Sequence, residues 1–140
     1  MHNIFIYGTL KHGYPNHNQY LKNQTYLGRY RTVDCYPLVI ANKWFAPVLI
    51  DEPGVGRHIV GELYQVANDK LKELDRLEHT DHVKGYVRIE INIQNIESGE
   101  LTKSFAYAKK RKYVTSISSQ YLSEYTDRKY IPMKMRKSLE

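Results

Sequence analysis

The chain has 140 residues, of which 41% are hydrophobic and 26% are charged; these values are typical of a folded protein and exclude a disordered one. No segment approaches the roughly 20 apolar residues that a membrane-spanning helix needs, and the first strand begins too early to leave room for a signal peptide. The single cysteine, Cys35, has no partner for an internal disulfide, so we expect a cytoplasmic protein with a single domain over residues 1–140.

The first predicted element is a buried strand that ends in a glycine turn. Residues 3–7 (Asn-Ile-Phe-Ile-Tyr) favour the strand, and Gly8 allows a sharp change of direction directly after it. This arrangement leaves the N–H groups of Gly8, Thr9 and Leu10 without strand partners, and successive free N–H groups on one bend bind an anion or a carbonyl oxygen. The alternative is a strand that simply stops at a turn.

Short strands separated by turns are predicted along the next part of the chain. Apolar or alternating patterns mark strands at residues 25–33, 38–40, 48–50 and 57–66. Pro37 and Pro47 are expected to bracket the strand at residues 38–40. The segment Asp-Glu-Pro-Gly-Val-Gly at residues 51–56 is typical of a turn.

One amphipathic helix is predicted over residues 70–78, with Asn68-Asp69 as its cap. Its apolar face consists of Leu71, Leu74 and Leu77. At about 100° per residue, Glu78 falls within this face, so its carboxylate is expected to point toward the interior. Loss of hydration there raises the pKa of a carboxyl group toward neutrality, which suits a proton shuttle. The alternative is a frayed last residue whose side chain reaches solvent.

The pattern after the helix completes the predicted fold. Residues 86–93 alternate strictly, and a turn at residues 97–100 leads into a further strand at 101–108. Strands therefore outnumber helices and cluster along the chain. The sequence predicts an α+β fold in which a small, closed or nearly closed mixed β-barrel packs against one principal helix.

A cluster of possible metal ligands lies at the end of the predicted helix, where Glu78, His79, Asp81 and His82 fall within five residues. Zinc needs three or four ligands in a closed geometry with supporting hydrogen bonds. The other candidates are scattered along the chain at His12, His17 and His58. We therefore expect no metal site and no cofactor.

The segment at residues 109–140 is basic and rich in tyrosine. It opens with the run Lys109-Lys110-Arg111-Lys112, and the net charge of the chain is +6. The alternative function is therefore a non-enzymatic RNA- or anion-binding module. Its stacking platforms would be Tyr113, Tyr121, Tyr125 and Tyr130. Because no motif of a known RNA-binding fold is present, the sequence favours a solvated surface, with no nucleic-acid partner and no membrane partner.

Several of these segments occur together, in the same order, in one family. They are residues 5–11 (FIYGTLK), 15–17 (PNH), 36–41 (YPLVIA), 53–57 (PGVGR), 61–66 (GELYQV), 74–78 (LDRLE) and 86–88 (YVR). Over roughly residues 4 to 110, the chain resembles the γ-glutamyl cyclotransferase-like superfamily, and within it the γ-glutamylamine cyclotransferases most closely. The segment at residues 79–85 and the tail after Tyr107 depart from the family pattern.

This resemblance implies the β-barrel-with-helices fold of the cyclotransferases and a cofactor-free reaction on a small γ-glutamyl amine or peptide. The α-amine of the substrate attacks its own γ-carbonyl, which gives 5-oxoproline and a free amine. Glu78 is the implied general base and then acid, and the turn formed by Tyr7, Gly8, Thr9 and Leu10 is expected to bind the glutamyl oxygens. Tyr86 and Tyr107 are possible pocket walls. The sequence leaves the leaving amine and the oligomeric state open.

Overall fold

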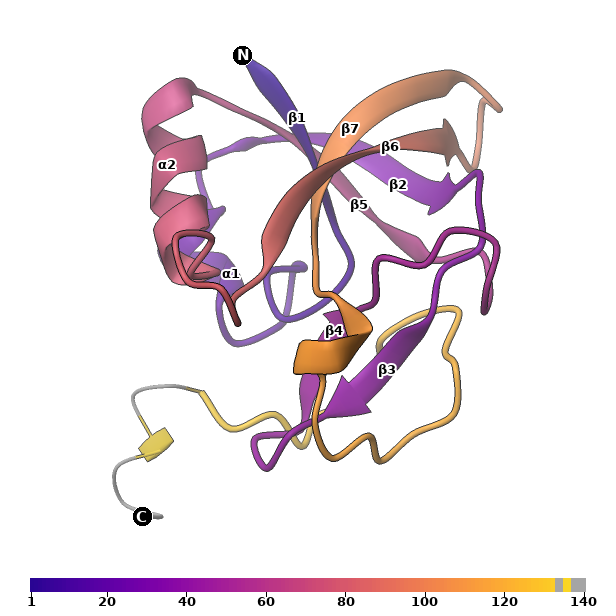
Figure 1. Cartoon of the computed structure of the whole chain (residues 1–140). Coiled ribbons are helices and arrows are strands. Elements are labelled where there is room, and N and C mark those ends of the chain that lie inside the picture. The colour runs from indigo at the N-terminus through magenta and orange to yellow at the C-terminus, as the bar shows by residue number, and fades with distance from the viewer. Residues whose placement is uncertain (133–134, 137–140) are drawn as a thin grey trace.

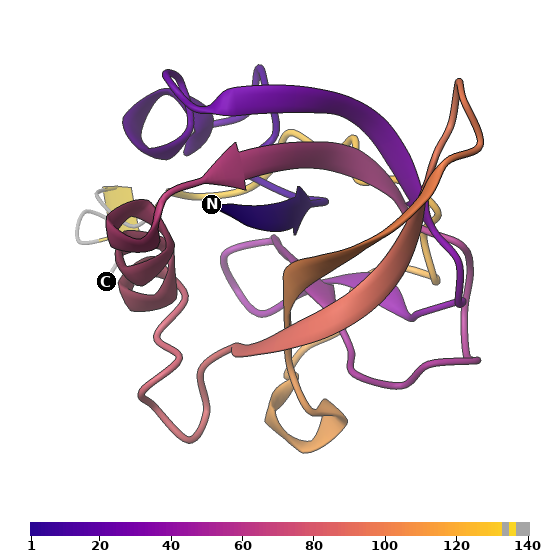
Figure 2. The same ribbon diagram turned by 90° about the horizontal axis from the view of Figure 1, so that it is seen from above.

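Five strands close into a mixed barrel in the computed structural model, which describes residues 1–132 and 135–136 (Figures 1 and 2). Around the barrel the strands follow the order β1 (His2–Ile6), β5 (Val60–Val66), β2 (Thr25–Thr32), β6 (Val87–Asn95) and β7 (Leu101–Ala108). The predicted fold class is therefore confirmed. The end of the predicted basic segment, residues 133–134 and 137–140, lies outside the described residues.

The closing contact of the barrel joins the first and last strands. β1 and β7 pair in parallel, with Ile4 opposite Phe105, whereas the other neighbouring strands of the barrel are antiparallel. Seen from above, the strands curve around a common interior and α2 (Asn68–Leu77) lies outside them (Figure 2). This closure brings the C-terminal ends of β1 and β7 to the same end of the barrel.

Alternation along the strands builds two neighbouring cores. Phe5 belongs to the cluster inside the barrel, whereas its neighbours Ile4 and Ile6 pack in a second cluster with the buried leucines of α2. The expected alternation of β6 is also present, since Ile91 and Ile93 are buried and the residues between and before them are exposed. Side chains of opposite faces therefore have different partners, and this fixes the register of the strands.

The N-cap of the principal helix lies one residue before the predicted cap. Ala67 is the N-cap residue of α2 and makes no side-chain capping bond, so the predicted cap at Asn68-Asp69 is wrong. The carboxylate of Asp69 instead accepts a hydrogen bond from the N–H group of Lys70 (2.9 Å) within the first turn. A second, shorter helix, α1 (His17–Tyr20), follows the first loop. Within the part of the chain that the structure describes, no helix is long and apolar enough to cross a membrane.

A two-stranded hairpin lies beneath one end of the barrel and consists of β3 (Leu38–Ala41) and β4 (Ala46–Leu49) (Figure 1). Pro37 and Pro47 flank β3 as expected, but the predicted start of the next strand at Val48 is wrong, because Pro47 itself lies within β4, opposite Ile40. The predicted strand at residues 57–66 also begins later, at Val60, since Arg57 instead forms an isolated bridge with Tyr36.

The segment after β7 packs on the hairpin and the barrel. A short 3-10 helix, η1 (Arg111–Tyr113), comes first, and the chain then follows β3, where the N–H group of Leu122 donates to the carbonyl of Leu38 (2.8 Å). Tyr125 is completely buried, and its carbonyl accepts a hydrogen bond from the ammonium group of Lys11 (2.6 Å). Tyr125 therefore cannot serve as the stacking platform that the alternative, nucleic-acid-binding interpretation required.

The buried hydroxyl of Tyr125 generates a prediction about stability. It has no hydrogen-bond partner among the described residues, so it carries a desolvation cost without a compensating bond. We expect Tyr125→Phe to raise the free energy of unfolding by ~1 kcal/mol, measured by urea denaturation. The control is Tyr7→Phe, which should lower it by ~1–3 kcal/mol because that hydroxyl makes two hydrogen bonds. A destabilised Tyr125→Phe protein would contradict the assignment.

Candidate active site

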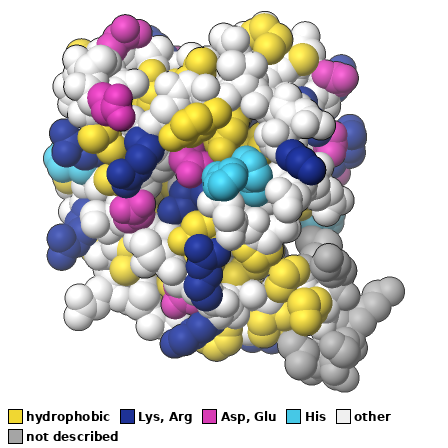
Figure 3. All heavy atoms as spheres, turned by 180° about the vertical axis from the view of Figure 1, so that it is seen from behind, with side chains coloured by type: hydrophobic (Ala, Val, Ile, Leu, Met, Phe, Trp, Pro, Cys, Tyr) yellow, Lys and Arg dark blue, Asp and Glu magenta, His cyan; other side chains and the backbone are white. Residues whose placement is uncertain are grey.

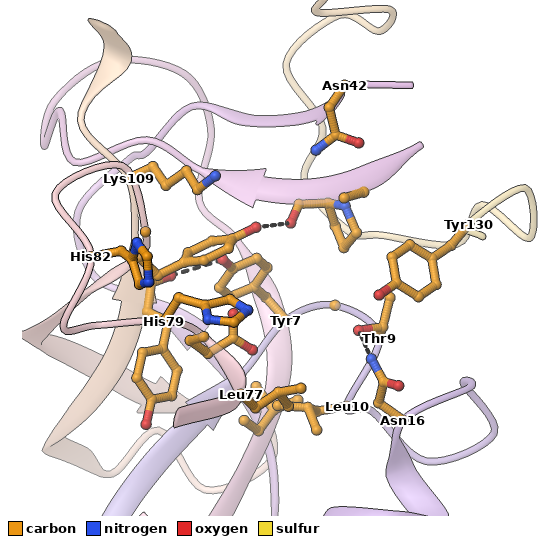
Figure 4. Close-up of a pocket in the computed structure, with 18 of the residues that line it drawn as sticks. Tyr7, Thr9, Leu10, Asn16, Asn42, Leu77, His79, His82, Lys109 and Tyr130 are labelled. Atoms are coloured by element: carbon orange, nitrogen blue, oxygen red, sulfur yellow. Dashed lines mark hydrogen bonds between the residues drawn. The ribbon is translucent and has the colours of Figure 1, made fainter. Parts of the chain in front are cut away.

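A cavity of about 430 Å³ opens where the end of the barrel meets the C-terminal end of α2 and the hairpin. It is lined by all the site residues predicted from the sequence: Tyr7, Gly8, Thr9, Leu10, Glu78, Tyr86 and Tyr107. Figure 4 shows Tyr7 deep in this cavity, with His79, His82 and Lys109 to one side of it and Thr9 and Tyr130 to the other. The structure thus brings together segments that are far apart in the sequence.

The turn after β1 presents unused backbone donors to the cavity. The carbonyl groups of Gly8 and Thr9 accept hydrogen bonds from the N–H groups of Lys11 and Asn16 (both 3.0 Å), and the Asn16 side chain donates to the Thr9 hydroxyl (2.9 Å; Figure 4). Within the described part of the chain, the N–H groups of Gly8, Thr9 and Leu10 donate to no protein acceptor. Donors held in place before a ligand arrives need no reorganisation to bind an oxygen atom.

The packing of this turn explains its glycine. A Cβ atom at Gly8 would lie 2.6 Å from Cγ of Pro47, a separation that real Cβ atoms do not tolerate. Pro47 also supplies the carbonyl that accepts a hydrogen bond from the Tyr86 hydroxyl (3.1 Å). Pro47 of the hairpin therefore packs against the turn at Gly8 and also accepts a hydrogen bond from Tyr86, a residue of the cavity wall.

Glu78 is fixed by the way in which α2 ends. It is the C-cap residue, its N–H group donates to the carbonyl of Leu74, and its own carbonyl accepts from the N–H group of Tyr86 (both 3.0 Å). His79 then turns the chain away with a φ of 56°. The loop returns at Gly85, where a Cβ atom would lie 1.9 Å from the carbonyl oxygen of His79. The backbone of Glu78 is thus held on both sides.

The carboxylate of Glu78 has no hydrogen-bond or ion-pair partner in the part of the chain that the structure describes. This side chain nevertheless lines the cavity. Burial raises the pKa of Glu78 to about 7, and the positive charge of Lys109 opposes this increase. Burial also raises the pKa values of Tyr7, Tyr86 and Tyr107, and the charge of Glu78 adds to each increase. A carboxyl group with this proton affinity can accept and return a proton near neutral pH.

Two tyrosine hydroxyls of the cavity connect the segments that surround it. The Tyr7 hydroxyl donates to the carbonyl of Tyr107 (2.8 Å) and accepts from the N–H group of Leu49 (3.3 Å). The Tyr107 hydroxyl in turn donates to Asp75 (2.7 Å), which also pairs with Arg88 (2.7 Å). Because Asp75 lies on α2, these bonds tie the helix to β7 and so position Glu78, which follows three residues later.

Several residues of the cavity were missed by the sequence analysis, and Lys109 is the most important of them. It was grouped with a solvated basic run, but the structure places it half-buried in the cavity wall. Asn42, Tyr130 and Arg136 also line the cavity. The available signal for Lys109 was its position, since it lies two residues after Tyr107, a predicted pocket residue.

The two alternative interpretations of the sequence gain no support. Arg111, from the basic run, is committed to a bidentate ion pair with Glu52 (2.7 and 2.8 Å). On the face opposite that of Figure 1, Lys and Arg side chains are interspersed with acidic and hydrophobic ones (Figure 3). The described residues contain no group of three or more His, Cys, Asp or Glu side chains that could hold a metal ion.

The fold has a close counterpart among solved structures. A crystal structure of an AIG2-like protein from Mus musculus superposes with a TM-score of 0.78 and 32% sequence identity, covering 90% of this chain and 88% of that one. The likeness therefore extends over nearly the whole of both chains, which defines the fold as that of the AIG2-like barrels.

Sequence comparison identifies the family. The profile of the family described as "Gamma-glutamyl cyclotransferase, AIG2-like" matches residues 4–128. Gamma-glutamylaminecyclotransferase C of Danio rerio is 35% identical over 114 residues, covering 77% of this chain and 75% of the relative. Gamma-glutamylaminecyclotransferase of Mus musculus is 37% identical over 117 residues (76% and 77%). The chain belongs to the γ-glutamyl cyclotransferase, AIG2-like family, and the match extends beyond residue 110, where the sequence resemblance was expected to end.

The raised pKa of Glu78 predicts how stability depends on pH. Between its ordinary value of 4.5 and about 7, the folded protein binds this proton more tightly than the unfolded chain does. Stability is therefore lost as the pH rises through this window. Since glutamine does not ionise, we expect Glu78→Gln to remove on the order of 1–3 kcal/mol of the fall in unfolding free energy between pH 5 and pH 8.

Denaturant unfolding at both pH values measures this difference, with Glu73→Gln as the control. Glu73 lies on the same helix and pairs with Lys70 (3.0 Å), away from the cavity. Equal pH dependence in the wild-type and Glu78→Gln proteins would show that Glu78 does not titrate near neutrality.

Proposed function

We propose that this chain is a cyclotransferase that converts γ-glutamyl amines to 5-oxoproline and a free amine. The family and the names of the relatives support γ-glutamyl cyclotransferase chemistry. The observation that carries the proposal is the juxtaposition, in one cavity, of the uncommitted carboxylate of Glu78 and the free N–H groups of the turn from Gly8 to Leu10.

The reaction needs one proton shuttle and one oxyanion site. The α-nitrogen of the substrate attacks the γ-carbonyl carbon and closes a five-membered ring, and the bond from that carbon to the leaving nitrogen then breaks. Glu78 accepts the proton that the α-nitrogen gives up and transfers it to the leaving nitrogen. The N–H groups of the turn stabilise the negative charge that develops on the carbonyl oxygen.

The enclosed pocket contributes by holding an intramolecular reaction in its attack geometry. The tyrosine walls at Tyr86 and Tyr107 surround the bound glutamyl group, and burial keeps the proton affinity of Glu78 close to that needed at neutral pH. The reaction consumes no water and transfers no electrons. The reaction therefore requires no cofactor. The proposed partner of the protein is a small molecule rather than a nucleic acid.

Replacement of Glu78 tests the proposed mechanism. Glu78→Gln keeps the size of the side chain but cannot carry a proton, so turnover should fall by about two to four orders of magnitude. The measurement is release of 5-oxoproline from a panel of γ-glutamyl amines, with circular dichroism to verify the fold. Glu73→Gln on the same helix should retain full activity. Normal turnover by a folded Glu78→Gln protein would exclude Glu78 from the mechanism, and no product from any amine would overturn the proposed activity.

The pH dependence of catalysis should report the same group. The base must be ionised before it accepts a proton, so kcat/KM should rise with pH and level off above about 7, the pKa of Glu78. Steady-state rates between pH 5 and pH 9 measure this rise of kcat/KM with pH. An acid limb near the ordinary carboxyl value of 4.5 would show that Glu78 is not the base.

A further inference from the structure

Lys109 is a half-buried cation that lines the cavity and has no role in the proposed proton transfer or oxyanion site. Its backbone is fixed between the hairpin and the segment that follows it, since its N–H group donates to Leu49 (2.8 Å) and its carbonyl accepts from Asp51 (2.9 Å). Its ammonium group lies 4.9 Å from the centre of the Tyr86 ring and forms no ion pair or side-chain hydrogen bond with the described residues. Figure 4 shows the side chain extending along the cavity wall toward the interior.

Glu78 and Lys109 are opposite charges on one cavity that do not neutralise each other. No ion pair within 4.0 Å joins them, yet the charge of each affects the proton affinity of the other. Two half-buried opposite charges that line one cavity without pairing with each other can each pair with a ligand that carries both a cation and an anion. The α-carbon of a glutamyl group carries such a pair, an ammonium group and a carboxylate on one atom.

The other cations of the cavity are less suited to this task. Lys84 is exposed at the rim. The guanidinium of Arg136 donates to the carbonyl of Ile131 (3.1 Å) and to the Tyr130 hydroxyl (3.4 Å), and it stacks 4.7 Å from the centre of the Trp44 ring. Lys109 combines partial burial with an uncommitted ammonium group.

We infer that Lys109 binds the α-carboxylate of the glutamyl group while Glu78 faces its α-amine. This assignment rests on the proposed function and refines it, because the turn from Gly8 to Leu10 is then left to the γ-carbonyl oxygen. It also makes Lys109 a specificity residue: the site selects substrates with a free α-carboxylate next to the attacking amine. A charge-assisted contact of this kind in a partly dry pocket is stronger than a neutral one.

A matched pair of ligands tests the inference by binding alone. 5-Oxoproline and 2-pyrrolidinone share the same ring and differ by the carboxylate. Calorimetric or NMR titration should show that wild-type protein prefers 5-oxoproline, and that Lys109→Gln weakens its binding by about 10–100-fold without changing the binding of 2-pyrrolidinone. Lys109→Arg should keep most of the preference. Lys110→Gln, at the exposed neighbouring position, should bind both ligands as the wild type does.

A matched pair of substrates gives the kinetic test. A γ-aminobutyryl amide is a γ-glutamyl amide that lacks the α-carboxylate, and its cyclisation gives 2-pyrrolidinone. Lys109→Gln should lower kcat/KM for the γ-glutamyl amide and leave that for the γ-aminobutyryl amide unchanged. An equal loss on both substrates, with a shifted pH profile, would mean that Lys109 acts through Glu78 instead, and would overturn the inference.

The failure of this inference can be told apart from the failure of the proposed function. If wild-type protein neither binds 5-oxoproline nor releases it from any γ-glutamyl amine, the proposed function is wrong. If turnover is normal and Lys109→Gln retains the full preference for the carboxylate, only the assignment of Lys109 is wrong.

Discussion

The hydrogen bonds of one hydroxyl group, that of Tyr7, join the three parts of the chain on which the pocket depends. This group donates to the carbonyl of Tyr107 at the end of β7 and accepts from the N–H group of Leu49 at the end of β4. It therefore connects the turn after β1 to the last barrel strand and to the hairpin. β1 and β7 are also the parallel pair that closes the barrel, so the same two strands close the fold and bring Tyr7 to Tyr107 in the pocket.

The pocket maintains a charge arrangement that does not favour stability. A carboxyl group without a partner loses hydration on folding, and its pKa rises because the ionised form is disfavoured there. An isolated residue of this kind would be expected to reach solvent or to acquire a partner. Here the helix end and the return of the loop at Gly85 hold the backbone of Glu78 in place, and Tyr107 and Asp75 hold the helix. Such a cost is common where function requires a poised group.

The elements with a strong local signal could be predicted from the sequence. The strict alternation of β6 and the leucine face of α2 each reflect burial on one side, and that face also placed Glu78 toward the interior. The first turn was recognisable because Gly8 directly follows an apolar strand. These features depend on neighbours within a few residues along the chain, which is the range that periodicity reports.

The remaining features depend on partners that are distant in sequence. Pro47 stays within a strand because the hairpin pairs it with Ile40, and no local pattern indicates that pairing. Tyr125 is buried because its irregular segment packs into the same cluster as Phe5, and an irregular segment has no periodic pattern that would indicate burial. Lys109 resembled the charges that follow it, although its backbone pairing with the chain after β4 places it in the cavity wall. In each case tertiary contacts outweigh local composition.

Glu78 is anchored at the end of α2, and this position has a consequence for protein engineering. Glu78 caps a helix that is tied to the barrel, and Tyr86 also holds its backbone where the loop ends, whereas the side chains of His79, His82 and Lys84 line the cavity from within that loop. A laboratory-evolution library confined to this loop, with Gly85 retained, would vary the rim of the pocket without moving Glu78. If Glu78 is the proton shuttle that we propose, such a library changes the substrate scope and leaves the proton transfer in place.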